Sequence, residues 1–291
     1  MDPFPLLVAP PLAVAVTLLI RLHPGLRRYA LLRYARRVDL PISTDLQARI
    51  ERLFARRSLW MDLGALCGTA AVAAWAAITR PAPMEWSLWM LVVFGALFAG
   101  GAVGAGLSAV QQATRRADPH EPRVARPTAV ALADYLIPLE LHGGRVLSFL
   151  PALTLAAAWG VAPSLDLAPA GSILTTGTVL IALLPLLVGA GSEAAARRLL
   201  ATPQAAGSDL ELAWNDALRA RVLRDLYTAP ITVGVYATLG ILIGLGGGLV
   251  DALVMAVLVL AVISATQRPH RHFRRQLWPS LHVEVAEGEA R

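Results

Sequence analysis

Long apolar runs, separated by polar segments that contain arginine, set the pattern of this chain. We find seven such runs, at residues 5–21, 59–79, 88–110, 146–162, 172–192, 229–245 and 249–266. Each is long enough to cross a hydrocarbon layer of roughly 30 Å as a helix, and helices satisfy their own backbone groups in lipid. The pattern therefore predicts an all-α, polytopic bundle of about seven transmembrane helices.

The first run needs a separate argument, because an apolar stretch at the start of a chain can also be a signal peptide. It contains Pro10 and Pro11, and it lacks the basic segment that precedes the apolar part of a signal peptide. We therefore expect residues 5–21 to form a membrane span.

The composition supports a membrane protein and excludes several other classes. Of the 291 residues, 56% are hydrophobic and 16% are charged, and the mean hydropathy is +0.57. Ordinary globular chains carry about 25% charged residues. The chain is too apolar for a disordered protein or a conventional soluble enzyme, and its single cysteine, Cys67, cannot form a disulfide within the chain.

The arginines set the expected orientation. All 26 basic residues are arginine, and every one except Arg80 lies in segments 21–58, 111–145, 193–228 and 267–291. Positively charged loops stay on the cytoplasmic side of a membrane. We expect these segments to be cytoplasmic, with the N-terminus outside and the C-terminus inside, in the cytoplasmic (inner) membrane of a bacterium.

Two similar segments suggest an internal repeat. Thr44–Gln47 and Ser208–Glu211 both have the pattern of a capping box, in which an N-cap hydroxyl and a side chain three residues later satisfy exposed backbone amides. They open two predicted cytoplasmic helices, 45–57 and 209–225, and each helix leads directly into a membrane hairpin. A cap is also what any cytoplasmic helix entering a membrane favours, so both interpretations stay open.

The repeat divides the chain into four parts. Residues 1–127 form a first three-span unit, 128–171 a connector with the fourth span, 172–267 a second three-span unit, and 268–291 a basic and then acidic cytoplasmic tail. This is a parallel 3+1+3 arrangement, which in transporters places sites at the repeat interface.

Glycines are concentrated in two of the predicted spans. Small residues let helices approach closely in lipid, where the hydrophobic effect does not drive association. We expect close helix packing, within one chain or across a homodimer, at Gly95, Gly100, Gly101, Gly104, Gly240, Gly244 and Gly248.

The sequence offers no recognisable catalytic, metal or cofactor site. Asp62 and Asp251 are the only acidic residues within the apolar runs, both near run ends, and all six histidines lie outside the runs. A phosphate-binding loop of the P-loop type needs a lysine, which this chain lacks. We therefore expect no cofactor, no bound metal and no ATP hydrolysis by this chain.

Two cytoplasmic surfaces are candidates for binding. An arginine-rich segment after the first run is typical of a helix lying among anionic lipid headgroups, and lipid is a better partner for it than nucleic acid. Its arginines are Arg27, Arg28, Arg33, Arg36 and Arg37. The helices 45–57 and 209–225 are expected to dock a cytoplasmic protein, the second through Trp214, Leu218, Arg219 and Arg221.

The arginine-only basic set, the alanine-rich spans and the two capped helices together resemble uncharacterised multi-pass membrane proteins of high-GC Gram-positive bacteria. This resemblance implies no activity and no site residues. The pattern itself favours a transport-associated subunit, permease-like or accessory, that works with a cytoplasmic partner. A non-transporting scaffold or regulator is the alternative. A third hypothesis, an interfacial lipid-modifying enzyme, requires several of Arg115, Arg116, Asp118, His120 and Arg268 to meet in one pocket.

Overall fold

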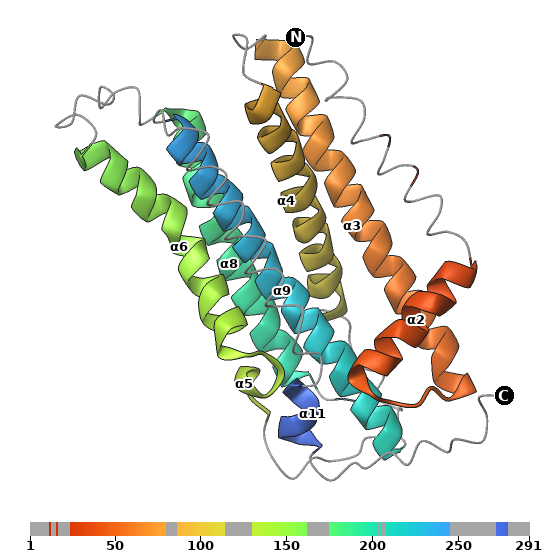
Figure 1. Cartoon of the computed structure of the whole chain (residues 1–291). Helices are drawn as coiled ribbons and strands as arrows, with labels where there is room; N and C mark the ends of the chain where they lie inside the picture. The colour runs from red at the N-terminus through yellow and green to blue at the C-terminus, as the bar shows by residue number, and fades with distance from the viewer. Residues whose placement is uncertain are drawn as a thin grey trace.

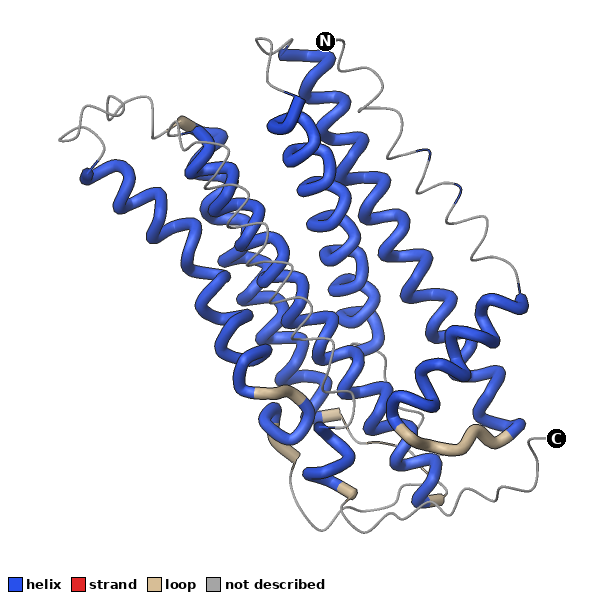
Figure 2. Tube along the Cα trace, viewed as in Figure 1, coloured by secondary structure: helices blue, strands red, loops and turns tan. Residues whose placement is uncertain are grey.

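The computed structural model describes most of the chain, and every regular element in that part is a helix (Figure 2). The described residues are 12, 16, 24–79, 86–113, 130–161, 175–202, 204, 206, 208–244 and 272–278. Most of the first predicted span, all of the seventh and most of the tail lie outside them, so that only the first of the two predicted hairpins is described.

Five of the helices are long and apolar enough to cross a membrane, within the residues that the structure describes. The chain is therefore an all-α, multi-pass membrane protein. These five are α3 (Thr44–Thr79), α4 (Trp86–Ala113), α6 (Pro138–Val161), α8 (Thr176–Ala201) and α9 (Asp209–Gly244), and the shorter helices are α2 (Pro24–Val38), α5 (Leu132–Tyr135) and α11 (His272–Leu277).

The two predicted cytoplasmic helices are continuous with the spans that follow them. α3 and α9 each run for 36 residues, so that one rod contains both a polar first part and an apolar second part. At the start of α9 the Ser208 hydroxyl accepts a hydrogen bond from the Glu211 amide at 3.2 Å, as a capping box requires. At the start of α3 the Gln47 side chain donates to Glu51 at 2.8 Å, and the side chain of Thr44 lies outside the described residues.

α3 and α4 form an antiparallel hairpin in which the two backbones touch (Figure 1). Gly64 and Gly68 of α3 face Gly100 and Gly104 of α4, and a Cβ built on any of the four would fall on a carbonyl oxygen of the other helix. Because glycine has no side chain, the helices approach closely enough for dispersion contacts between their backbones, which is how spans associate in lipid.

α9 is the central helix of the molecule and packs against α4, α6 and α8 (Figure 1). Small residues again allow the approach: a Cβ on Gly144 of α6 would lie 2.8 Å from the Tyr227 ring, and one on Gly234 of α9 would meet the Leu147 carbonyl. The outer faces of α6 and α8 are apolar and exposed, as at Phe149 and Leu187, and these faces suit contact with lipid tails.

A second packed region lies at one end of the bundle, where α2, α5 and α11 cover the first parts of α3 and α9 (Figure 1). We call this region the platform. Its core contains the largest fully buried side chains of the described chain, among them Trp214, Tyr135 and Phe273. The platform therefore has a hydrophobic core of its own, of the kind found in soluble domains.

Candidate functional site

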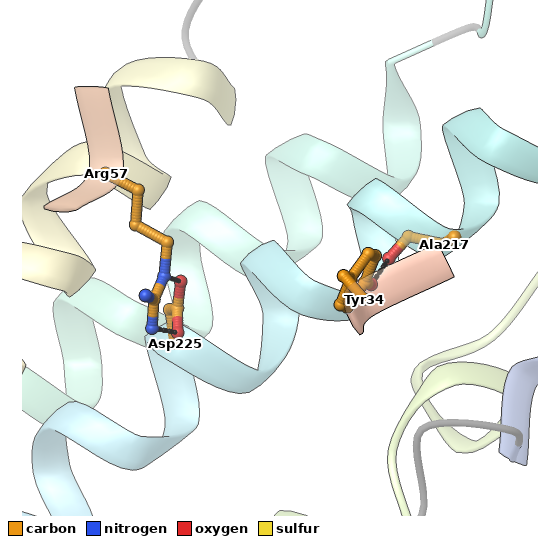
Figure 3. A network of polar contacts seen from close by, with 4 residues as sticks. All are labelled: Tyr34, Arg57, Ala217 and Asp225. Atoms are coloured by element: carbon orange, nitrogen blue, oxygen red, sulfur yellow. Dashed lines mark hydrogen bonds and ion pairs between the residues drawn. The ribbon is translucent and has the colours of Figure 1, made fainter. Parts of the chain in front are cut away.

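The charged side chains of the described structure gather where the platform joins the spans. Arg57 of α3 and Asp225 of α9 form a two-bond ion pair, with Nη2 2.6 Å from Oδ1 and Nε bonded to the second oxygen (Figure 3). The side chains are 22% and 11% exposed, so water screens the pair only weakly. This pair links the α3–α4 hairpin to the central helix.

Next to this pair, α2 is attached to α9 through Tyr34. Its hydroxyl donates to the Ala217 carbonyl at 2.8 Å (Figure 3), and its ring meets Phe54 edge-on with 5.2 Å between centroids. The Arg221 guanidinium lies 4.1 Å from the centre of the Phe54 ring and 4.8 Å from that of Tyr34. Burial raises the pKa of the Tyr34 phenol above its ordinary value of 10.0, so the group is neutral at physiological pH.

Two more carboxylates connect α6 and α8 to α9. Glu140 accepts a hydrogen bond from Arg224 at 3.0 Å. It accepts another, at 3.3 Å, from the backbone amide of Ile137, the residue before α6. Glu193 accepts from Arg145 at 2.7 Å and also from the Tyr227 hydroxyl. Each acid is thus held by a donor on a neighbouring helix.

Asp216 of α9 anchors the remaining short elements. It is fully buried, and its two oxygens accept hydrogen bonds from Tyr135 at 2.9 Å and from Trp278 at 2.8 Å. Nearby, Arg274 of α11 bonds to the carbonyl and carboxylate of Asp39, which ends α2 in a left-handed conformation with φ of 57°. Asp tolerates this conformation better than most residues.

The polar contacts described above hold helices together. No group of three or more His, Cys, Asp or Glu in the described residues could hold a metal ion. The hydroxyls inside the spans donate to carbonyls of their own helix, a local pattern common in membrane helices. These hydroxyls belong to Thr69, Ser148, Thr154, Thr232 and Thr238.

The residues expected to dock a partner are used within the chain instead. The Trp214 indole is buried and donates to the Pro41 carbonyl at 2.7 Å, and Arg219 is buried and donates to the Thr202 carbonyl at 2.6 Å. Arg221 stacks on the two rings described above, and Leu218 packs against the platform core. None of these contacts presents Trp214 or Arg219 to an outside protein.

The expected headgroup arginines lie on an open surface. Arg28, Arg33, Arg36 and Arg37 are exposed on α2, and the side chain of Arg27 lies outside the described residues.

The predicted packing glycines divide into two groups. Those of α4 lie in contacts: Gly100 and Gly104 face α3, Gly101 would carry a Cβ 3.6 Å from the Met61 carbonyl, and Gly95 would carry one 2.8 Å from the Tyr236 ring. In α9, a Cβ on Gly240 would have nothing within 4 Å among the described atoms.

Several predicted positions lie outside the described residues. Gly244 closes α9, but its surroundings and Gly248 are not described. The same is true of the residues expected to meet in an enzyme pocket, Arg115, Arg116, Asp118, His120 and Arg268.

Sequence reasoning missed Tyr34, Glu140 and Glu193 as parts of this network. The signal available for the two acids was their position, since Glu193 directly follows an apolar run, Glu140 precedes one by six residues, and each is near an arginine. Tyr34 gave no such signal, because its partner Ala217 is 183 positions away along the chain.

Compared with known proteins, the chain matches no protein-family model, no curated protein and no solved structure at a significant level.

Proposed function

We propose that this chain is an accessory subunit of a membrane transport assembly, and that its platform holds a soluble partner at the cytoplasmic face of a bacterial membrane. The observation that carries the proposal is the continuity of α3 and α9, whose polar first parts form the platform and whose apolar second parts cross the bundle. A partner bound to the platform is thereby connected to the spans without a flexible linker.

The buried ion pairs support a platform of fixed shape. Arg57 with Asp225, and Arg224 with Glu140, join α9 to two different helices in partly buried surroundings. A preorganised surface loses less conformational entropy when a partner binds.

The surface open to a partner is the exposed side of the first part of α3. Arg49 and Arg52 are exposed there, and Arg49 forms an exposed pair with Glu211 of α9 at 3.2 Å. At 1.5 Å per residue, Arg52 lies roughly 10 Å before the apolar run that starts at Leu59. An acidic patch on a soluble protein is the complementary partner of these two arginines.

Co-purification from the native membrane tests the proposal. The doubly substituted Arg49→Glu/Arg52→Glu chain should lose a cytoplasmic partner that the native chain retains. The control is Arg197→Glu/Arg198→Glu, which reverses two exposed charges on α8 and should leave the partner bound. The absence of any partner on the native chain, or equal loss in both variants, would overturn the proposal.

A non-transporting scaffold or regulator is the second candidate. It is supported by the span hydroxyls, because groups bonded to their own helix, such as Thr232 and Thr238, are not directed at a solute. The identity of the co-purified partner separates the candidates: a transport component supports the first, and a partner of another class supports the second. Uptake or export by the purified chain alone would contradict both.

A further inference from the structure

We propose that the outer face of α2 binds the headgroups of anionic phospholipids. This inference concerns a different surface from the one assigned to a protein partner, and it does not depend on the proposed function.

α2 has two distinct faces. Its inner face consists of Leu31, Tyr34, Ala35 and Val38, which are all buried against the platform. Their spacing of three and four residues is that of one side of a helix. The helix is therefore held in a fixed rotation, and its opposite side is presented outward.

The outer face is basic and has no acidic counterpart within the helix. Arg33 and Arg36 are exposed there, Arg28 is exposed near the start of the helix, and α2 contains no acidic residue. Within the part of the chain that the structure describes, none of these three arginines takes part in a hydrogen bond or an ion pair. Their guanidinium groups are thus available for anionic oxygen atoms, which they can bind through two parallel hydrogen bonds.

Large apolar side chains lie between these arginines. Tyr29 is 62% exposed and Leu32 is 43% exposed on the same helix. A soluble surface gains nothing from such exposure, but a helix lying in the membrane interface buries these groups among the upper parts of the acyl chains while its cations meet the headgroups.

The depth of α2 agrees with the headgroup layer. Tyr34 packs on Phe54, which precedes the apolar run starting at Leu59 by little more than one helical turn. At 1.5 Å per residue this separation is roughly 7 Å. The headgroup region on each side of the hydrocarbon core is roughly 5 to 8 Å thick. Measured along α3, the middle of α2 is therefore close to the level of the phosphates.

The occupant follows from charge and position together. Each arginine close to an anionic lipid surface raises the affinity for that surface roughly fivefold. An acidic protein would satisfy the charge, but at this depth it would have to displace lipid and leave Tyr29 and Leu32 without an apolar environment. Phospholipid supplies both the anion and the apolar environment.

The test uses the full-length protein in nanodiscs, with a single fluorescent label on α2. Cys67, the only cysteine, is first changed to Ser, and Ala30→Cys on the exposed face receives an environment-sensitive dye. Replacing a third of the phosphatidylcholine with phosphatidylglycerol should shift the dye emission to the blue, and raised salt should reverse the shift. In Arg33→Gln/Arg36→Gln, the apparent affinity for phosphatidylglycerol should fall roughly 25-fold.

The matched control removes the same charge elsewhere. Arg198→Gln/Arg275→Gln changes two exposed arginines that are not on α2, and it should keep the lipid response of the native chain. Thermal unfolding in phosphatidylcholine alone should be the same for both variants, which separates loss of binding from loss of folding. An unchanged dye signal with phosphatidylglycerol, or equal loss in both variants, would overturn the proposal. A shift produced by soluble polyglutamate but not by phosphatidylglycerol would overturn it in favour of an acidic protein.

Discussion

Side chains of α9 connect it to several of the described helices. Each contributes to stability only together with its partner. Asp225, Arg224 and Tyr227 contact α3, α6 and α8 respectively, through Arg57, Glu140 and Glu193. An ion pair taken out of water gains little over an apolar pair of similar size, but removing one partner leaves a charge without compensation. Substitutions at these positions should therefore differ strongly according to whether one or both partners change.

The Arg57–Asp225 pair gives the first test. Asp225→Asn should lower the free energy of unfolding by about 2 to 3 kcal/mol, because Arg57 loses its counter-charge in a partly buried site. The double change Arg57→Met/Asp225→Leu should recover most of this loss. Thermal unfolding in detergent measures both. Arg49→Gln, which breaks an exposed pair, is the control and should cost less than about 1 kcal/mol.

Tyr34 gives a second test, with a defined pH dependence. Tyr34→Phe removes the buried bond to the Ala217 carbonyl and should cost about 1 kcal/mol at pH 8. Burial raises the Tyr34 pKa above 10.0 in the folded chain, whereas the unfolded chain ionises near that value. The extra stability of the native chain over Tyr34→Phe is therefore fully present below pH 10 and declines as the pH rises further. Denaturant titrations should show a smaller difference in the free energy of unfolding between the two proteins at pH 11 than at pH 8. A larger difference at pH 11 would contradict this assignment.

Among the elements, the α3–α4 hairpin depends on the absence of side chains at its contact. Gly104→Ala should destabilise the protein by about 2 kcal/mol, because the new methyl group would fall on the Trp60 carbonyl and force the helices apart. Gly191→Ala, on α8, makes the same chemical change where nothing lies within 4 Å. It should be neutral or slightly stabilising. Equal effects of the two changes on the unfolding temperature would show that the hairpin contact is not the cause.

Hydropathy predicted the existence of these helices better than their ends. The run 88–110 agrees closely with α4, which spans Trp86–Ala113. The run 146–162 misses the beginning of α6 at Pro138, because Glu140 and Arg145 lower the local hydropathy. Both charges are paired across helices, so they can lie in a membrane helix, and a single sequence does not show which distant residue pairs with them.

The contacts of the candidate site could not be predicted, for a related reason. Trp214, Leu218, Arg219 and Arg221 were interpreted as a surface for another protein, because a pattern shows that a face must be covered without showing what covers it. The chain covers it with its own α2 and α11, through Trp214, Tyr34 and Phe273. The exposed arginines of α2 were easier to identify, since exposure of charge needs no partner within the chain.

At the scale of the whole molecule, the orientation predicted from the arginines can be tested directly. In a Cys67→Ser background, Ala48→Cys lies at the exposed start of α3 and Thr175→Cys at the exposed start of α8. An impermeant maleimide added to intact spheroplasts should label position 175 and not position 48, and inverted vesicles should give the opposite result. Labelling of both positions from the same side would contradict the predicted topology.

The central position of α9 has a consequence for biosynthesis. α9 follows α3, α4, α6 and α8 along the chain, so it leaves the ribosome after all four. Until then Arg57 and Glu140 have no access to Asp225 and Arg224, and a charge without its partner is costly in the lipid interior. The growing chain must keep these groups at the water boundary while translation continues. Docking of these helices against α9 therefore waits for α9, and a chain truncated before residue 209 lacks the partners of Arg57 and Glu140.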